Sequence, residues 1–135
     1  RYYSRQNIFS AAATPQTAAS AIKAIQLVDK EPQLRNNLLD NINYFKKGLE
    51  QLHLDFGNTE SAIFPVMVRS EQNVKEAARV LFDRGIYVNP ISYPAVPEKL
   101  SRLRFSVTAM HTTEDLDQTL DILESIKSTY NLIKE

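Results

Sequence analysis

The sequence predicts an α/β fold in two layers, with helices covering one face of a small, three-stranded, largely antiparallel sheet. Two observations lead to this prediction. Apolar residues recur every three or four positions in four segments, which is the period of an α-helix, and they alternate with polar residues in another segment, which is the period of a β-strand. The expected order is helix, helix, strand, helix, strand, strand, helix, and such a chain buries its helices against its sheet.

The first two elements are expected to be helices. Thr14 is a good N-cap, and Pro15 suits the first helical position because its missing N–H group costs nothing there. This helix should run to about Asp29. After Pro32 a longer helix is expected, with apolar positions at Leu34, Leu38, Ile42, Phe45, Leu49 and Leu52.

The middle of the chain alternates between strand and helix. Residues 63–68 are typical of a strand, which Pro65 restricts to a sheet edge or a bulge. Ser70 can cap a third helix, and Gly85 would end it. Residues 86–91 are expected to form the second strand.

An ordered, non-helical loop is expected over residues 92–99, because it contains two prolines. The strand that follows alternates strictly: one face carries Leu103, Phe105 and Val107, and the other carries Arg102, Arg104, Ser106 and Thr108. Thr112 then caps a last helix that has acidic residues in its first turn. Its apolar positions are Leu116, Leu120, Leu123, Ile126 and Tyr130.

The polar face of the last strand is the strongest candidate site. No element of this chain remains to cover it, so either water covers it or a missing domain and its ligand do. If the face is covered, the guanidinium groups of Arg102 and Arg104 need partners, because an unpaired charge is costly to bury. A carboxylate or a phosphate would then be expected there.

Composition excludes several classes of function. The 135 residues include 16 basic and 16 acidic side chains, so no net charge attracts a nucleic acid or a membrane surface. The absence of cysteine excludes disulfides and thiolate metal sites. No apolar run approaches the roughly 20 residues that span a bilayer. We expect one soluble, cytoplasmic domain without a metal site.

Neither histidine points to catalysis. His53 lies near the expected end of the second helix and is interpreted as a structural residue. His111 follows the last strand, where a turn or capping residue is more common than a catalyst. The two lie far apart in sequence, and no acidic cluster adds the spacing of metal ligands.

Five segments, in this order and spacing, resemble a known enzyme family. They are Phe9-Ser-Ala-Ala-Ala-Thr-Pro15, Ser61-Ala-Ile-Phe-Pro65, Leu81-Phe-Asp-Arg-Gly-Ile-Tyr-Val88, Ser92-Tyr-Pro-Ala-Val-Pro97 and Arg102-Leu-Arg-Phe-Ser-Val-Thr-Ala-Met-His-Thr112. The series resembles the C-terminal part of the α-oxoamine synthases. These pyridoxal-phosphate enzymes include 8-amino-7-oxononanoate synthase, glycine C-acetyltransferase and serine palmitoyltransferase. The last segment, with its Y-P-x-V-P run ahead of it, is the most specific of the five.

The resemblance implies the fold-type I aminotransferase architecture, with residues 1–135 as its small C-terminal domain. Residues 1–30 would include the connecting segment and a helix from the large domain. The large domain, absent here, would bind pyridoxal phosphate, since none of the eight lysines has the family's Schiff-base sequence context. The full-length protein would be a homodimer that joins an amino acid to an acyl-CoA, and this fragment alone would have no catalytic residue and no activity.

The resemblance also assigns roles to single residues. Arg104 matches the arginine that binds the α-carboxylate of the amino-acid substrate, whereas Arg102 and His111 receive no role. Ser10 matches a position that in some relatives reaches the cofactor phosphate of the neighbouring subunit. Ser92 and Tyr93 stand where some 8-amino-7-oxononanoate synthases carry an arginine suited to the distal carboxylate of pimeloyl-CoA, so acetyl and long-chain acyl donors stay open.

A different class of function also remains open at this point. The chain could be a stand-alone α/β module that binds an anionic ligand on the face with Arg102 and Arg104. An upstream large domain that carries the Schiff-base lysine would distinguish the enzyme from this module.

Overall fold

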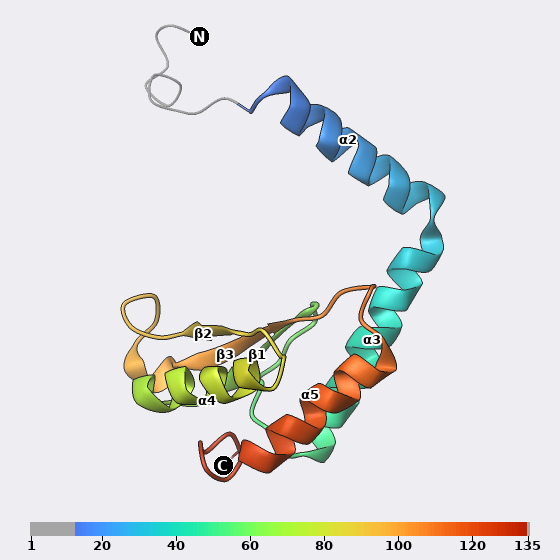
Figure 1. Cartoon of the computed structure of the whole chain (residues 1–135). Helices are drawn as coiled ribbons and strands as arrows, with labels where there is room; N and C mark the ends of the chain where they lie inside the picture. Colours follow the sequence, from blue (N-terminus) through green and yellow to red (C-terminus); the bar gives the residue numbers. More distant parts are fainter. Residues whose placement is uncertain (1–12, 135) are drawn as a thin grey trace, which may run out of the picture. The chain divides into compact units, whose positions relative to one another are not determined.

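The computed structural model describes residues 13–134, which divide into two compact units at residue 34 (Figure 1). The first unit contains helix α2 (Pro15–Lys30), which has no buried side chain. The Oγ1 of Thr14 accepts a hydrogen bond from the backbone N–H of Thr17 at 3.3 Å, and Pro15 opens the helix. The predicted start of this helix is therefore confirmed.

The second unit contains a three-stranded sheet and three helices. Its elements are α3 (Pro32–Gln51, whose first residues lie in the first unit), β1 (Ile63–Met67), α4 (Glu71–Asp83), β2 (Asn89–Ile91), the 3₁₀ turn η1 (Glu98–Leu100), β3 (Arg102–Ser106) and α5 (Thr113–Ile126). The strands lie in the order β1-β3-β2, and both neighbouring pairs are antiparallel. The predicted fold class and element order are confirmed, and Pro65 lies in an edge strand as expected.

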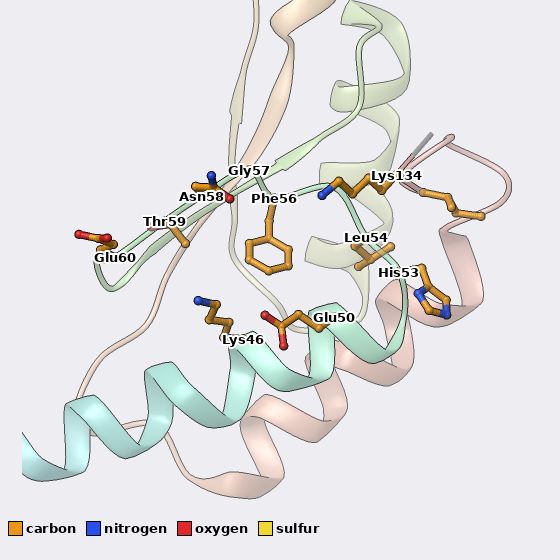
Figure 2. Close-up of a pocket in the computed structure, with 11 residues that line it drawn as sticks. Lys46, Glu50, His53, Leu54, Phe56, Gly57, Asn58, Thr59, Glu60 and Lys134 are labelled. Atoms are coloured by element: carbon orange, nitrogen blue, oxygen red, sulfur yellow. The ribbon is translucent and has the colours of Figure 1, made fainter.

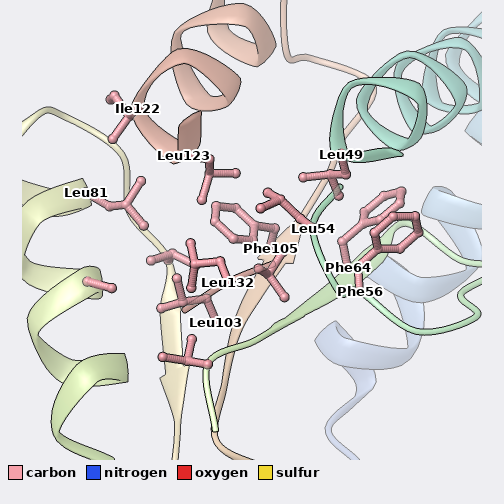
Figure 3. Close-up of a cluster of buried hydrophobic side chains, with 14 of the residues drawn as sticks. Leu49, Leu54, Phe56, Phe64, Leu81, Leu103, Phe105, Ile122, Leu123 and Leu132 are labelled. Carbon is pink, nitrogen blue, oxygen red and sulfur yellow. The ribbon is translucent and has the colours of Figure 1, made fainter. Parts of the chain in front are cut away.

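One face of the sheet forms the hydrophobic core. Phe64 and Val66 of β1 and Leu103 and Phe105 of β3 are buried on this face. Three helices pack there through Phe45 and Leu49 of α3, Val74, Ala77 and Leu81 of α4, and Leu116, Ile122, Leu123 and Ile126 of α5 (Figure 3). Alternation along β3 therefore places its arginines on the opposite face, which no helix of the second unit covers among the described residues.

Local hydrogen bonds fix the ends of the helices as predicted. The Oγ of Ser70 caps α4 by accepting from the backbone N–H of Asn73, and Gly85 follows α4 with a φ of 88°. Thr112 and Asp115 form a reciprocal capping box at the start of α5. Each of these contacts joins residues close in sequence, so the sequence pattern predicts them.

Three boundaries differ from the prediction. Strand β2 begins at Asn89 and not at residue 86, because the backbone N–H of Ile86 donates to Leu81 and completes the C-cap of α4. The loop of residues 92–99 leads into η1 and is therefore not wholly irregular. Helix α5 ends at Ile126, so Tyr130 lies in the turns that follow it.

Candidate functional site

The open face of the sheet is built around Arg104. This residue lies on the central strand β3, directly opposite Pro65 of β1 and Asn89 of β2. Residues directly opposite each other in an antiparallel pair point to the same face, with their Cβ atoms about 4.5–5.5 Å apart. Arg104 therefore emerges between one apolar and one polar neighbour.

The two arginines of β3 have different surroundings. Arg102 is half-buried, and its Nε donates a 2.9 Å hydrogen bond to the backbone oxygen of Leu100 at the end of η1. Arg104 is exposed, and its guanidinium makes no hydrogen bond or ion pair with any residue from 13 to 134. Arg104 can therefore give its full set of donors to a ligand.

A shallow hollow of about 610 Å³ lies on this face. Its lining combines apolar side chains with polar and charged ones: Ile63, Pro65, Ile91, Val96, Asn58, Thr59, Ser61, Glu60, Arg102 and Arg104. Arg104 also lines a second hollow of about 460 Å³, which it shares with Asn89 and His111. Of the guanidinium groups that line the two hollows, that of Arg104 has no protein partner among the described residues. The hollows therefore suit a ligand that carries both an anionic group and an apolar group.

His111 holds the turn that follows β3. Its Nδ1 accepts a hydrogen bond from the backbone N–H of Thr108 at 3.2 Å. The side-chain nitrogen Nδ2 of Asn41 donates to the backbone oxygens of Thr108 and His111, at 3.0 and 2.9 Å. The side chain of Asn41 thus connects α3 to the turn that follows β3 through these two hydrogen bonds. Sequence reasoning gave the turn role of His111 but missed Asn41, whose contacts span about 70 residues.

The start of α5 forms part of the wall of the second hollow through Asp115. The pKa of Asp115 lies below its usual value, mainly because the backbone N–H of Thr112 donates a hydrogen bond to this carboxylate. The hydroxyl of Thr112 makes a smaller contribution in the same direction. Asp115 therefore stays ionised at neutral pH as part of the helix cap. Its hydrogen bonds assign it a structural role.

Another hollow, of about 820 Å³, lies elsewhere, between the end of α3 and residues 54–60 (Figure 2). Figure 2 shows Phe56 lying between this loop and α3, above Lys46 and Glu50, with His53 at the helix end. His53 has a φ of 57° and follows α3 in a left-handed turn, so its predicted position near the end of this helix is confirmed. None of the residues predicted to bind substrate lines this hollow, and its charges have both signs.

The residues around Arg104 do not form a complete site for pyridoxal phosphate. Holding this cofactor covalently requires a lysine amine, and no lysine from the described part of the chain lines either hollow at Arg104. The free guanidinium among these residues suits a carboxylate or a phosphate, and none of the residues can hold the cofactor covalently. Ser10, the residue predicted to approach the cofactor phosphate, lies outside the described residues.

No helix in residues 13–134 combines the length and the apolar character needed to cross a membrane.

Comparison with known proteins finds a matching family model and related enzymes. Residues 1–123 match the family model of aminotransferase class I and II. An 8-amino-7-oxononanoate synthase from Thermoanaerobacter pseudethanolicus is 39% identical over 129 residues, which are 96% of this chain and 33% of that protein. A serine palmitoyltransferase from Sphingobacterium spiritivorum is 37% identical over 121 residues, which are 90% of this chain and 30% of that protein.

Comparison of the fold with solved structures finds the same kind of enzyme. A serine palmitoyltransferase structure with pyridoxal phosphate superposes with a TM-score of 0.83 at 27% identity, over 98% of this chain and 34% of that one. The chain thus spans about a third of the length of the proteins it matches. These relatives give no support to a stand-alone anion-binding module. With a family model matched over most of its length, the chain belongs to the aminotransferase class I and II family.

Proposed function

We propose that this chain is the small C-terminal domain of a pyridoxal-phosphate-dependent acyl-CoA:amino-acid C-acyltransferase, an α-oxoamine synthase. Residues 1–30 would include the connection to the large domain. The observation that carries this proposal is Arg104, which offers its guanidinium to a ligand on an open sheet face in a chain related to 8-amino-7-oxononanoate synthase and serine palmitoyltransferase.

The role of Arg104 is to bind the α-carboxylate of the amino-acid substrate. The planar guanidinium fork can donate two parallel hydrogen bonds to a carboxylate, which fixes orientation as well as position. Lysine offers only a point charge. Each charge-assisted hydrogen bond contributes about 1.5–3 kcal/mol, and the orientation gained adds to the rate of the reaction. Leu103 and Phe105, buried on either side of Arg104 in sequence, hold this part of β3 in place.

The remaining parts of the site belong to the large domain. Pyridoxal phosphate, bound there, supplies the electron sink for the reaction at the amino acid's α-carbon. The full-length protein would act as a cytoplasmic homodimer on an amino acid and an acyl-CoA, and Ser10 would approach the cofactor phosphate of the neighbouring subunit. Residues 1–135 alone would be inactive.

The residues just before Pro94 narrow the range of acyl donors that we propose. Ser92 and Tyr93 carry no charge that could bind a distal carboxylate of the acyl group at that position. Ile63, Ile91 and Val96 offer an apolar lining next to Arg104. These features favour acetyl or long-chain acyl donors over a pimeloyl donor.

The test is release of free CoA by the full-length protein supplied with pyridoxal phosphate. Glycine, L-alanine and L-serine would each be combined with acetyl-, pimeloyl- and palmitoyl-CoA. We expect CoA release that requires one amino acid and one acyl-CoA together, and none from residues 1–135 alone. Absence of amino-acid-dependent release with every combination would contradict the proposal.

A further inference from the structure

We infer that Asn89 is a second substrate-binding residue, whose side-chain amide donates to the same carboxylate that Arg104 binds. This inference rests on the proposed function of Arg104 and extends it to a residue on the neighbouring strand. Asn89 is the polar member of the pair that flanks Arg104 across the sheet, since Pro65 stands on the other side.

The register brings the two side chains together. Asn89 of β2 lies directly opposite Arg104 of β3, so their Cβ atoms are about 5 Å apart on the same face. Both residues line the hollow of about 460 Å³. A carboxylate held by the guanidinium of Arg104 would therefore lie within reach of the amide of Asn89.

The hydrogen-bonding capacity of Asn89 is unused within the described part of the chain. Its side chain is half-buried and makes no hydrogen bond with any residue from 13 to 134. By contrast, Asn41, also half-buried, uses its Nδ2 for two backbone oxygens. The amide of Asn89 and the guanidinium of Arg104 are therefore both free to bind the same external group.

The chemistry of a carboxylate explains why two residues are needed. Its two oxygens can accept about four hydrogen bonds, and a bidentate arginine supplies two of them. An amide N–H of Asn89 can supply a third without adding charge. An acidic residue at this position would pair with Arg104 instead and would repel the substrate.

The backbone holds Asn89 in place for this role. Because Pro90 follows, the conformation of Asn89 is restricted to the extended region, which is the conformation of the strand. Pro90 pairs with Leu103, whose side chain is fully buried. The backbone of Asn89 is therefore held in place before the substrate arrives.

The experiment compares variants of the full-length enzyme at Asn89 with Arg104→Lys as the reference and Asn43→Ala as the control. Asn43 is an exposed asparagine on α3, far from the sheet in sequence. We expect Asn89→Ala to raise the KM for the amino acid about tenfold, the loss of one hydrogen bond to a charged group, and to leave the KM for the acyl-CoA unchanged. Asn89→Asp should raise the KM for the amino acid further, and Asn43→Ala should leave this KM unchanged.

A binding measurement separates this role from a structural one. The dissociation constants of the amino acid and of the corresponding amine without a carboxylate are measured by calorimetry, with no acyl-CoA present. We expect Asn89→Ala and Asn89→Asp to weaken binding of the amino acid and to leave binding of the amine unchanged.

Two outcomes would overturn the inference, and they differ in what they say of Arg104. If Arg104→Lys weakens amino-acid binding and the Asn89 variants do not, Asn89 has no such role while that of Arg104 stands. If neither Arg104→Lys nor the Asn89 variants change amino-acid binding, the substrate carboxylate does not bind at Arg104.

Discussion

The contact between α3 and α5 makes one sharp prediction about stability, at Gly48. A Cβ atom added to this glycine would lie 2.3 and 2.8 Å from the two terminal methyl carbons of Leu120 on α5. Real side chains do not approach so closely, so Leu120 or its helix must shift. A Cβ at position 48 therefore works against the packing of Leu120, inside a helix that would otherwise favour alanine.

The magnitude follows from two opposing effects. Alanine stabilises a helix interior by about 1 kcal/mol relative to glycine. Forcing an extra methyl group into a packed contact costs about 1–3 kcal/mol. Gly48→Ala should therefore destabilise the native protein by about 1 kcal/mol. In the Leu120→Ala background the clash is absent, and the same change should stabilise the protein by about 1 kcal/mol.

A double-mutant cycle measures this change of sign. The free energy of unfolding of the chain and its three variants is obtained from urea denaturation followed by circular dichroism. Asn43→Ala, at an exposed position of α3, is the control and should have the same effect in both backgrounds. An equal effect of Gly48→Ala with and without Leu120 would refute the close approach of the two helices.

Three further predictions concern the same fold. Gly85→Ala should destabilise it by about 1–2 kcal/mol in urea denaturation, because φ is 88° while no atom lies near the added Cβ. Leu103→Ala should cost about 2–5 kcal/mol, measured in the same way, because this side chain is fully buried under the sheet. The lowered pKa of Asp115 makes a contribution that is fully present above about pH 4 and is lost as the pH falls through the lower native value. Denaturation measured from pH 6 to pH 2 should show this loss, and Asp115→Asn should reduce it.

Much of the fold could be predicted because its signals are local. Thr14, Ser70 and Thr112 accept hydrogen bonds from residues three positions later, and a pattern that short is visible in the sequence. The alternation of β3 likewise identifies its buried face, and with it the face that carries Arg104.

The features that could not be predicted depend on contacts between distant segments. Strand β2 starts after Ile86 because the backbone N–H of Ile86 donates a hydrogen bond to Leu81 at the end of α4. The pairing of Asn89 with Arg104 depends on the register between two strands, which the alternation within each strand does not specify. For the same reason, the alternation within β3 is enough to indicate Arg104 as a candidate, whereas Asn89 becomes one only through its pairing in the folded sheet.

The most direct test of the account is the KM of the full-length enzyme for its amino-acid substrate after Arg104→Lys. Lysine keeps the positive charge but loses the bidentate fork, so one charge-assisted hydrogen bond of about 1.5–3 kcal/mol is lost. The account predicts that this KM rises about 10- to 100-fold while cofactor content and the KM for the acyl-CoA stay unchanged. An unchanged amino-acid KM in a fully loaded enzyme would show that Arg104 does not bind the substrate carboxylate.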